Sequence, residues 1–465
     1  RGAERVLSSV GDPDPSAPAR LRVSPHSCQR KAAQMAVLQV PTGVEQKEKK
    51  GSVAAASVNL TKNLIGAGIF SLPTALLRGS VLPGLGVMMF AGVVQGSSFV
   101  MIAFLCQQLG CSSYRGVFSA AFGKRAGDIV DLCIMTNSLF ACVAYNILVA
   151  DFLQKALEGL FGWEAVSRPL LIWTNTMFIT MPLSHARNLS PLRYTSMLGL
   201  AIIAFVFLYV TTDFFSNFSE ARLNLHAHAA RLDMGLFTTL ALCTGAFQAH
   251  YNSPKFFKEL GCDLQAHIRT VMTSFGAAFT IYSLFAVSGL GLFGDGLLGN
   301  VLKNYPAEGN VAVLMAWLGM AFAIVFTYPL VFTTGRDSLL GLVPALQRAS
   351  KSSPTITHVA MTSGPVALIA TVACLVDDVS KITGMLGATI GACLCWIFPA
   401  CIYLKVTAVG GALGDCAAPL LPGRAPPAGK VAIKGSPVLR AYSKGMVAVG
   451  LSSMAVGVSR TLGLL

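Results

Sequence analysis

The sequence predicts an all-α polytopic membrane protein of about eleven transmembrane helices, and three observations support this fold class. First, 54% of the 465 residues are hydrophobic and only 12% are charged, whereas soluble domains carry about 25% charged residues. Second, apolar stretches of about 20 residues, the length that crosses a bilayer as a helix, recur along most of the chain. Third, most of these stretches lack the polar stripe of a soluble amphipathic helix.

The chain divides into four predicted parts. Residues 1–50 are rich in Pro, Ser, Arg and Lys, which is typical of a disordered tail, and we place this tail in the cytoplasm. Residues 51–408 hold ten spans, residues 409–439 form a flexible cytoplasmic loop rich in Gly, Pro and Ala, and residues 440–465 form the eleventh span. Because the chain opens with Arg1, we expect it to be a fragment or a gene-model product.

The positions of the apolar stretches and of the basic residues together predict the membrane topology. The spans comprise residues 53–77, 81–109, 128–157, 170–185, 194–210, 235–252, 267–293, 310–332, 358–376, 382–403 and 445–465. If the N-terminus is cytoplasmic, most of the 35 Lys and Arg residues lie in the tail and in the loops on the cytoplasmic side. The net charge of +14 is therefore a topology signal, and no nucleic-acid partner is predicted.

One sequon lies where glycosylation is expected. An odd number of spans leaves the C-terminus outside, and it puts Asn217-Phe218-Ser219 in the exterior loop after span five. Asn217 is therefore a glycosylation candidate. The sequons at Asn59 and Asn188 fall in the membrane and in the cytoplasm, so neither is expected to be used.

No enzyme is predicted. The chain has no G-x-S-x-G elbow, no H-E-x-x-H motif, no phosphate-binding loop and no carboxylate pair within a span. No cofactor or metal site is predicted either, because the Cys393 and Cys395 pair is interpreted as helix packing. The cysteines fall within spans or in predicted cytoplasmic segments, so no stabilising disulfide is expected.

Span one carries the strongest sign of an interrupted helix, the sequence NLIGAGIFSLP at residues 63–73. Each glycine lowers helix preference by about 1 kcal/mol and proline lowers it by about 3 kcal/mol, so a break is expected at Gly66 to Gly68. The amides exposed by a break suit a carboxylate, and the freed carbonyls suit a cation or an ammonium group. An α-amino acid carries both charges. The alternative is plain helix packing through small residues.

Span six contains the second candidate break. Thr244 and Gly245 lie in mid-span, and His250, Asn252 and Pro254 follow them. Interrupted spans at positions one and six predict an inverted repeat of five plus five helices with a binding site at the membrane midplane. The repeat is positional only, since the two halves share no residue-level identity. The predicted substrate-binding residues are Asn63, Gly66, Ala67, Gly68, Ile69, Thr244 and Gly245.

Three residues within spans are candidates for ion coupling or gating, and each has a structural alternative. Lys62 shares a helix face with Gly66, so its ammonium either reaches the break or extends to the cytoplasmic interface. His250 is either a proton relay or a hydrogen-bonded structural histidine. Thr327 precedes Tyr328-Pro329, and its hydroxyl either faces a loosened turn or bonds its own helix backbone.

Five motifs in order resemble the amino acid/auxin permease family, most closely its neutral amino acid transporter branch. The resemblance covers residues 57–403, nearly the whole membrane region. Its motifs are GAGIFSLPTA (66–75), PLSHARNLSPLRYTS (182–196), AFQAHYNSPKFFKEL (246–260), YSLFAVSGLGLFG (282–294) and FTYPLVFTTGR (326–336).

The resemblance implies a LeuT-like fold with alternating access driven by an ion gradient. The substrate carboxylate would meet the amides near Gly66 to Gly68. In sodium-coupled members, a polar residue of span one and a threonine of span eight line the cation site, and these align with Asn59 or Lys62 and with Thr327. A lysine there would repel sodium by several kcal/mol. We therefore favour H⁺ coupling or sodium-independent transport over Na⁺ symport.

The function expected from the sequence is secondary active transport of small neutral amino acids. One alternative is an amino acid sensor that keeps the transporter fold, and another is a transporter of an amine or auxin. The expected partners are the amino acid substrate and membrane lipid. The expected location is the plasma membrane or a vacuolar or lysosomal membrane, whereas the sequence leaves side-chain specificity and oligomeric state open.

Overall fold

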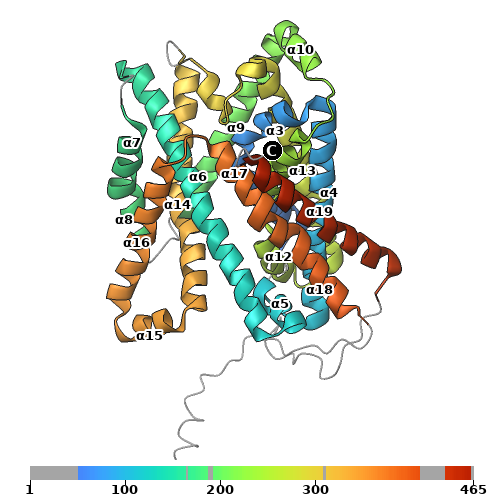
Figure 1. Ribbon diagram of the computed structural model, residues 1–465. Helices are drawn as coiled ribbons and strands as arrows, with labels where there is room; N and C mark the ends of the chain where they lie inside the picture. The colour runs from blue at the N-terminus through green and yellow to red at the C-terminus, as the bar shows by residue number, and fades with distance from the viewer. Residues whose placement is uncertain (1–50, 164–165, 187–191, 307–309, 409–434, 462–465) are drawn as a thin grey trace, which may run out of the picture. The chain divides into compact units, whose positions relative to one another are not determined.

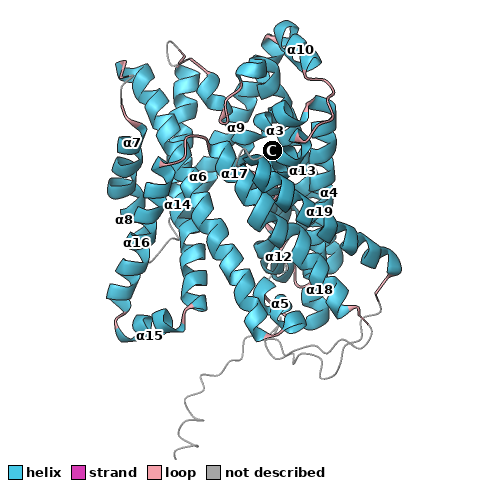
Figure 2. Ribbon diagram, viewed as in Figure 1, coloured by secondary structure: helices cyan, strands magenta, loops and turns pink. Residues whose placement is uncertain are grey.

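A computed structural model describes residues 51–163, 166–186, 192–306, 310–408 and 435–461, which all belong to one compact unit that begins at Gly51. The predicted tail and most of the predicted loop at 409–439 lie outside the described residues. Within this part of the chain the secondary structure is helical, with no strand drawn in Figure 2. The predicted all-α class is therefore confirmed.

Most of the long helices run without interruption through the unit. They are α4 (Val81–Leu109), α6 (Gly127–Phe161), α9 (Leu192–Ser216), α13 (Leu264–Phe293), α14 (Val311–Leu342), α16 (Pro354–Cys374) and α19 (Pro437–Thr461). Short helices connect them at the two ends of the unit. These are α5 (Tyr114–Phe122), η2 (Lys124–Ala126), α10 (Phe218–Ala227), η5 (Gly294–Gly296), η6 (Val301–Asn304) and α15 (Pro344–Ser352).

Four of the predicted spans are built from shorter helices in sequence. Span one is α2 (Val53–Leu64), the 3₁₀ helix η1 (Ala67–Ser71) and α3 (Leu72–Gly79). Span four is α7 (Arg168–Asn175), the π-helix η3 (Thr176–Thr180) and α8 (Met181–His185). Span six is α11 (Gly235–Ala246), η4 (His250–Asn252) and α12 (Ser253–Glu259). Span ten is α17 (Val379–Leu386), the π-helices η7 (Gly387–Gly391) and η8 (Cys393–Ile397), and α18 (Phe398–Val406).

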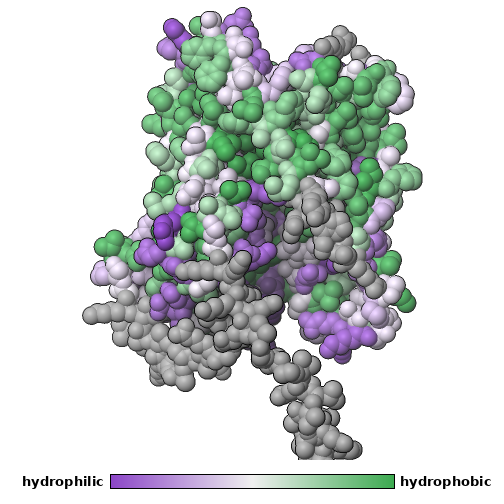
Figure 3. All heavy atoms as spheres, turned by 180° about the vertical axis from the view of Figure 1, so that it is seen from behind, coloured by the Kyte–Doolittle hydropathy of each residue, from purple (hydrophilic) through white to green (hydrophobic). Residues whose placement is uncertain are grey.

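The length and hydrophobicity of the helices are those of a multi-pass membrane protein. In the described part of the chain, seven helices are long and apolar enough to cross a bilayer, and α2 with α3, bent by 54°, makes an eighth. The other predicted spans, α7–α8, α11–α12 and α19, are helical but shorter, interrupted or less hydrophobic, so the count of eleven stays a prediction. Figure 3 shows a broad band of hydrophobic residues with hydrophilic residues gathered above and below it.

Local sequence signals explain where the helices begin and end. The side chains of Asp263 and Asn310 accept hydrogen bonds from the first amides of α13 and α14. Gly110 and Gly162 end α4 and α6 in the left-handed conformation that glycine adopts freely. The last helix begins at Pro437, three residues before the predicted boundary at 440, because proline is well suited to the first helical turn.

The long helices form two groups that meet along one interface. The first group contains α2 with α3, α4, α11 with α12, and α13, and these helices pack mainly on one another. The second group contains α6, α7 with α8, α9, α14 and α16, and it lies toward the left of Figure 1. Span ten lies between them, because α17 contacts both α11 and α6. Both interrupted spans of the first group thus face the interface region.

At the predicted exterior end, a charge cluster ties α6 and α7 of the second group to the segment between α13 and α14. Asp151 of α6 is only 2% exposed, and its carboxylate lies 3.2 Å from Arg168 Nε and 3.3 Å from Lys303 Nζ. Arg168 also donates to the carbonyl oxygen of Val376 at 2.7 Å. Thr74 of α3 donates to the carbonyl oxygen of Leu298. The segment between α13 and α14 is therefore anchored to both groups.

Nine cysteines of the described residues are free thiols. The expectation that the chain has no stabilising disulfide stays a prediction.

The contact of α11 with η7 depends on the absence of a side chain at Gly387. A Cβ at Gly387 would lie 1.9 Å from the carbonyl oxygen of Ala241 and 2.9 Å from the amide nitrogen of Gly245. Gly245 is also close to span ten, since its Cβ would lie 3.2 Å from the carbonyl oxygen of Thr383. Backbone meets backbone here, so span ten holds α11 just before the break in span six.

We predict that Gly387→Ala destabilises the protein, because the new methyl group must push α11 and η7 apart. The expected loss is ~1–3 kcal/mol, the usual cost of overpacking a close contact. The measurement is the thermal unfolding midpoint of the purified chain in detergent. Gly364→Ala on α16 is the matched control, because its Cβ would meet nothing within 4 Å. Equal midpoints for the two variants would contradict this account of the contact.

Candidate substrate site

The helix of span one is interrupted at the predicted position. α2 ends at Leu64, and the chain is extended at Ile65 (φ −75°, ψ 90°) and at Gly66 (φ −121°, ψ −161°). The 3₁₀ helix η1 then begins at Ala67, and Ile69 N donates to Gly66 O at 3.2 Å. The predicted break at Gly66 to Gly68 is therefore confirmed.

The helix of span six is interrupted as well. α11 ends at Ala246, and residues 247–249 are not helical before η4 begins at His250. Pro254 lies in the first turn of α12, where its missing N–H leaves no bond unmade. The predicted interruption is thus present, and it falls directly after Thr244 and Gly245.

The two breaks lie side by side. A Cβ at Gly68 would lie 3.6 Å from the Cα of Ala246, so the start of η1 packs against the end of α11. Across the same gap, Asn252 Nδ2 donates to Asn63 Oδ1 at 3.3 Å. A Cβ at Gly66 would meet nothing within 4 Å. The turn at Gly66 therefore borders open space while its neighbours are packed.

A single buried phenol contacts the ends of both interrupted helices. Tyr282 of α13 has no exposed surface, and its hydroxyl lies 2.6 Å from Leu64 O and 3.0 Å from Ala246 O. Leu64 ends α2 and Ala246 ends α11, so these oxygens belong to the negative ends of two helix dipoles. One hydroxyl proton is shared between two carbonyls, which leaves acceptor capacity at this point.

The other side of the break presents backbone amides. The first N–H groups of a helix have no partner within it, and here they belong to the turn at Gly66, Ala67 and Gly68. These donors lie beside the carbonyl ends described above, because Gly68 packs on Ala246. Donors for a carboxylate and acceptors for an ammonium group are thus close together, which is the pattern that suits an α-amino acid.

The remaining predicted substrate residues lie around this point but do not all face it. Ile69 is 1% exposed, beside Phe70 in the core. Thr244 is fully buried, and its hydroxyl has no hydrogen-bond partner among the described residues. Its methyl side faces span ten, since a Cβ at Gly391 would lie 3.0 Å from Thr244 Cγ2. Thr244 and Gly245 therefore fix α11 against span ten.

Asn59, Lys62 and Asn63 are exposed or half-exposed residues of α2, and Gly66 follows just after the helix ends. Lys62 Nζ lies 3.8 Å from the sulfur of Met197 on α9. No acidic group forms a salt bridge with Lys62 among the residues that the structure describes. The ammonium thus points toward the second helix group, three to four residues before the break.

His250 is hydrogen-bonded to α4, and Thr327 is hydrogen-bonded within its own helix. His250 has no exposed surface, and its Nε2 lies 2.7 Å from Ser98 Oγ and 3.1 Å from Gln95 O on α4. Thr327 donates to the carbonyl oxygen of Ala323 in its own helix at 2.8 Å. These contacts match the structural alternative for each residue. Their roles in ion coupling stay untested predictions.

Asn217, the glycosylation candidate, is exposed at the start of α10. Its side-chain amide donates to the backbone oxygen of Asp213 at 3.0 Å and to Asp213 Oδ1 at 2.9 Å. Figure 1 places α10 at the opposite end of the unit from α5 and α15, as the predicted topology requires.

Sequence reasoning missed Tyr282, Gln248 and the hydroxyl pair of Ser71 and Thr383 as site residues. Gln248 lies in the non-helical segment of span six, and its Nε2 is buried with no hydrogen-bond partner in the described part of the chain. Ser71 Oγ lies 3.4 Å from Thr383 Oγ1 of α17. Tyr282 opens a family-like motif, but no local pattern reveals that its hydroxyl meets residues 218 and 36 positions away.

We predict that Tyr282→Phe destabilises the protein by ~1–3 kcal/mol, because two buried carbonyl oxygens lose their donor. The thermal unfolding midpoint of the purified chain would show this loss. Tyr209→Phe is the matched control, because the hydroxyl of Tyr209 is paired with Asn310 at an exposed site. A midpoint for Tyr282→Phe that is no lower than that of Tyr209→Phe would show that the hydroxyl does not hold the helix ends.

The known proteins that resemble this chain in sequence include amino acid transporters. The chain is 26% identical over 381 residues to amino acid transporter AVT6B of Arabidopsis thaliana, covering 76% of this chain and 82% of that protein. It is 24% identical over 384 residues to vacuolar amino acid transporter 2 of Saccharomyces cerevisiae, covering 78% of each. Among solved structures, the nucleobase-cation-symport-1 family transporter Mhp1 aligns with a TM-score of 0.47 at 14% identity, covering 91% of this chain and 94% of that chain.

The family assignment follows from a match over most of the chain. The sequence profile of the family described as transmembrane amino acid transporter protein matches residues 49–411. This range includes both interrupted spans, Tyr282 and every predicted substrate residue. It also confirms the resemblance to the amino acid/auxin permease family. The chain belongs to the transmembrane amino acid transporter protein family.

Proposed function

We propose that this chain is a secondary active transporter that moves small neutral amino acids across a membrane by alternating access. The observation that carries the proposal is the meeting of two interrupted helices at one point, with the first backbone amides of η1 at Gly66 to Gly68 and the carbonyl ends of α2 and α11 at Leu64 and Ala246. A zwitterionic amino acid binds such a pair of opposite helix-dipole ends, with its carboxylate at the amides and its ammonium group at the carbonyl oxygens.

The charge pattern around the breaks supports a neutral side chain. Residues 53–71 and 235–252 contain no Asp or Glu, so no carboxylate from either break region is available to pair with a basic substrate side chain. The close approach of Gly68 to Ala246 supports a small substrate, because a large side chain would need this contact to open.

The tertiary contacts support alternating access. The charge cluster of Asp151, Arg168 and Lys303 ties α6 and α7 of the second group to η6, in the segment between α13 and α14, at the predicted exterior end. At the opposite end, the face of α2 with Asn59 and Lys62 is partly exposed. We propose that this conformation is open toward the cytoplasm, and that separation of the exterior cluster accompanies opening to the other side.

We propose that coupling uses protons or is absent, in preference to sodium symport. The sodium site implied by the resemblance would lie between α2 and α14. Here α2 packs chiefly on α13, and α14 packs chiefly on α6 and α9. A lysine about 5 Å from a bound sodium ion would repel it by ~3 kcal/mol at an effective dielectric constant near 20. Lys62 is the residue that carries this charge.

The proposed membrane is the plasma membrane or a vacuolar or lysosomal membrane, with the N-terminus in the cytoplasm. The excess of Lys and Arg in the predicted cytoplasmic segments supports this orientation. A sensor that binds amino acids without moving them is the second candidate. It shares the same binding geometry, so the transport measurement below separates the two.

The first test is uptake by the purified chain in liposomes under imposed gradients. We expect radiolabelled small neutral amino acids to accumulate faster than lysine, glutamate, an amine or auxin. Gly66→Leu is expected to reduce uptake at least tenfold, because it fills the open side of the turn, whereas Gly364→Leu on α16 is the control. Saturable binding without uptake would favour the sensor, and faster uptake of an amine or auxin would overturn the substrate assignment.

The second test concerns the coupling ion. We expect uptake by the unmodified protein to change less than about twofold when potassium replaces sodium, because Lys62 repels sodium by a few kcal/mol. Lys62→Ala is expected to make uptake sodium-stimulated, and Lys258→Ala on α12 serves as the exposed control. If the unmodified protein already requires sodium, the proposed role of Lys62 is wrong, whereas amino acid transport itself would stand.

A further inference from the structure

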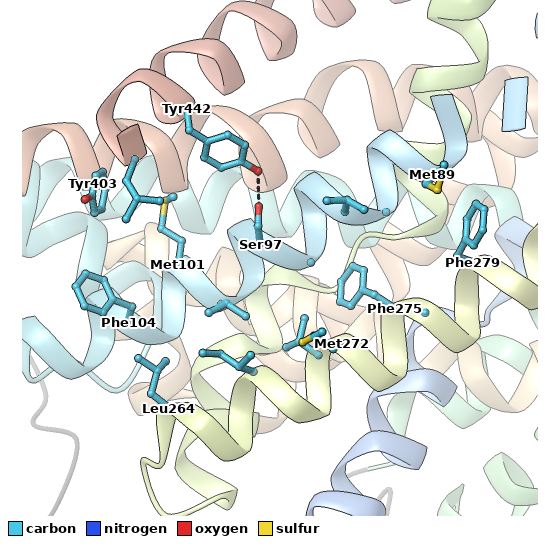
Figure 4. Close-up of a pocket in the computed structure, with 18 residues that line it drawn as sticks. Met89, Ser97, Met101, Phe104, Leu264, Met272, Phe275, Phe279, Tyr403 and Tyr442 are labelled. Carbon is cyan, nitrogen blue, oxygen red and sulfur yellow. Dashed lines mark hydrogen bonds between the residues drawn. The ribbon is translucent and has the colours of Figure 1, made fainter. Parts of the chain in front are cut away.

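A cavity lies on the membrane-facing side of the first helix group, away from the interface with the second. It is a groove of about 710 Å³ between α4 and α13, closed at one end by α18 and α19. Its volume lies within the range of sites for drug-sized ligands. Figure 4 shows that most of its lining is apolar, with Met101 and Phe104 from α4, and Met272, Phe275 and Phe279 from α13.

The position of the groove decides what kind of molecule fills it. Both long walls are membrane-spanning helices, and side chains at the rim are exposed outward, with Met89 at 54% and Met272 at 71% exposure. Side chains of membrane spans that are exposed outward face hydrocarbon. The occupant is therefore a lipid-soluble molecule taken from the bilayer.

One hydrogen-bonded pair interrupts the apolar lining. Tyr442 of α19 points at Ser97 of α4, and their hydroxyls are hydrogen-bonded (Figure 4). Ser97 donates its only proton to the carbonyl oxygen of Val94 at 2.7 Å, so it accepts the proton of Tyr442. The phenol oxygen of Tyr442 then has lone pairs but no proton to give. A ligand that pairs with it must donate a hydrogen bond.

This polarity separates two kinds of membrane lipid. The ester and phosphate oxygens of phosphatidylcholine only accept hydrogen bonds, whereas the hydroxyl of a sterol donates one. Tyr442 is paired with Ser97, which lies 16 residues after the start of α4, or about 24 Å along it and near its middle. The donated hydrogen bond therefore holds the sterol hydroxyl deep in the groove.

The floor of the groove suits a flat ring system. Gly92 and Gly96 of α4 leave room for aromatic rings, because their Cβ atoms would lie 3.3 Å from Phe247 and 3.4 Å from Phe275. A Cβ at Gly276 of α13 would meet nothing within 4 Å, so this position opens directly into the groove. Glycines and ring faces form a smooth surface, against which a rigid fused ring loses little conformational entropy.

The groove also touches the helix breaks through a line of rings. Phe275 in its wall stacks on Phe247, with ring centroids 6.0 Å apart. Phe247 is the first residue after α11, and its ring lies 5.1 Å from that of Tyr282. The groove is thus two ring contacts from the hydroxyl that joins the interrupted helices.

We propose that this groove binds one sterol molecule. Its hydroxyl donates to Tyr442, and its rings lie over Gly96 and Phe275. Through Phe247 and Tyr282, the bound sterol restrains the break in span six and changes the transport rate. This last step rests on the proposed function, whereas sterol binding does not.

The binding test uses a photoreactive sterol and the purified full chain in phosphatidylcholine nanodiscs. We expect labelled peptides from α4, α13 or α19, competition by cholesterol, and at least fivefold weaker competition by cholesterol methyl ether, which has no hydroxyl proton. Tyr442→Phe is expected to reduce labelling at least fivefold. Gly276→Leu fills the groove and is expected to abolish labelling, while Gly364→Leu leaves it unchanged. At both glycines a Cβ would meet nothing within 4 Å, so neither leucine variant is expected to misfold. A difference in labelling between the two variants is therefore not explained by misfolding.

Three results would overturn sterol binding at this groove. Labels that map elsewhere, equal competition by the methyl ether, or unchanged labelling of Gly276→Leu each contradict the assignment. A groove filled by a phospholipid chain gives equal competition by added phosphatidylcholine, and one covered by a second copy of the chain gives no sterol labelling at all.

The transport test compares uptake in liposomes with and without cholesterol. We expect cholesterol to change the uptake rate at least twofold for the unmodified chain and for Gly364→Leu, but not for Gly276→Leu. Labelling without any effect on uptake would refute the coupling through Phe247. No uptake under either condition would instead refute the proposed function and leave the binding result standing.

Discussion

The structure depends on how backbone groups freed by two helix breaks are satisfied inside a membrane protein. Unpaired carbonyl oxygens in hydrocarbon cost several kcal/mol each, so a broken span persists only where it faces protein or a cavity. At the ends of α2 and α11 the hydroxyl of Tyr282 meets both oxygens. One proton between two acceptors holds the helix ends together and still leaves them able to accept from a ligand.

The helices around this point are fixed by different means. α11 is held against span ten by backbone contact at Gly387, where no side chain fits. The outer half of span one is anchored by Phe70, whose ring packs edge-on against Phe152 and Phe285. Between these anchors, Gly66 borders open space. Packed helix segments therefore surround a short non-helical turn that borders open space.

The same rings connect two regions with different surroundings. Phe247 lies between Tyr282 at the helix ends and Phe275 in the wall of the apolar groove. A change in the break alters how Phe247 packs, and a molecule in the groove alters how Phe275 packs. Since close-packed side chains shift together, the packing of Phe247 links the helix breaks to the lipid-facing surface.

The sequence by itself determined the fold class, the family and the position of both breaks, because these depend on local properties. Apolar length sets the spans, and glycine or proline in mid-span interrupts a helix whatever surrounds it. Asn63, Gly66 and Gly68 were found in this way, and the structure brings them beside Ala246 and Asn252. The tertiary structure alone decided that Tyr282 joins the helix ends, that His250 packs on α4 and that Thr244 faces span ten. These contacts join residues far apart in the chain, so their partners are set by packing and leave no local pattern in the sequence.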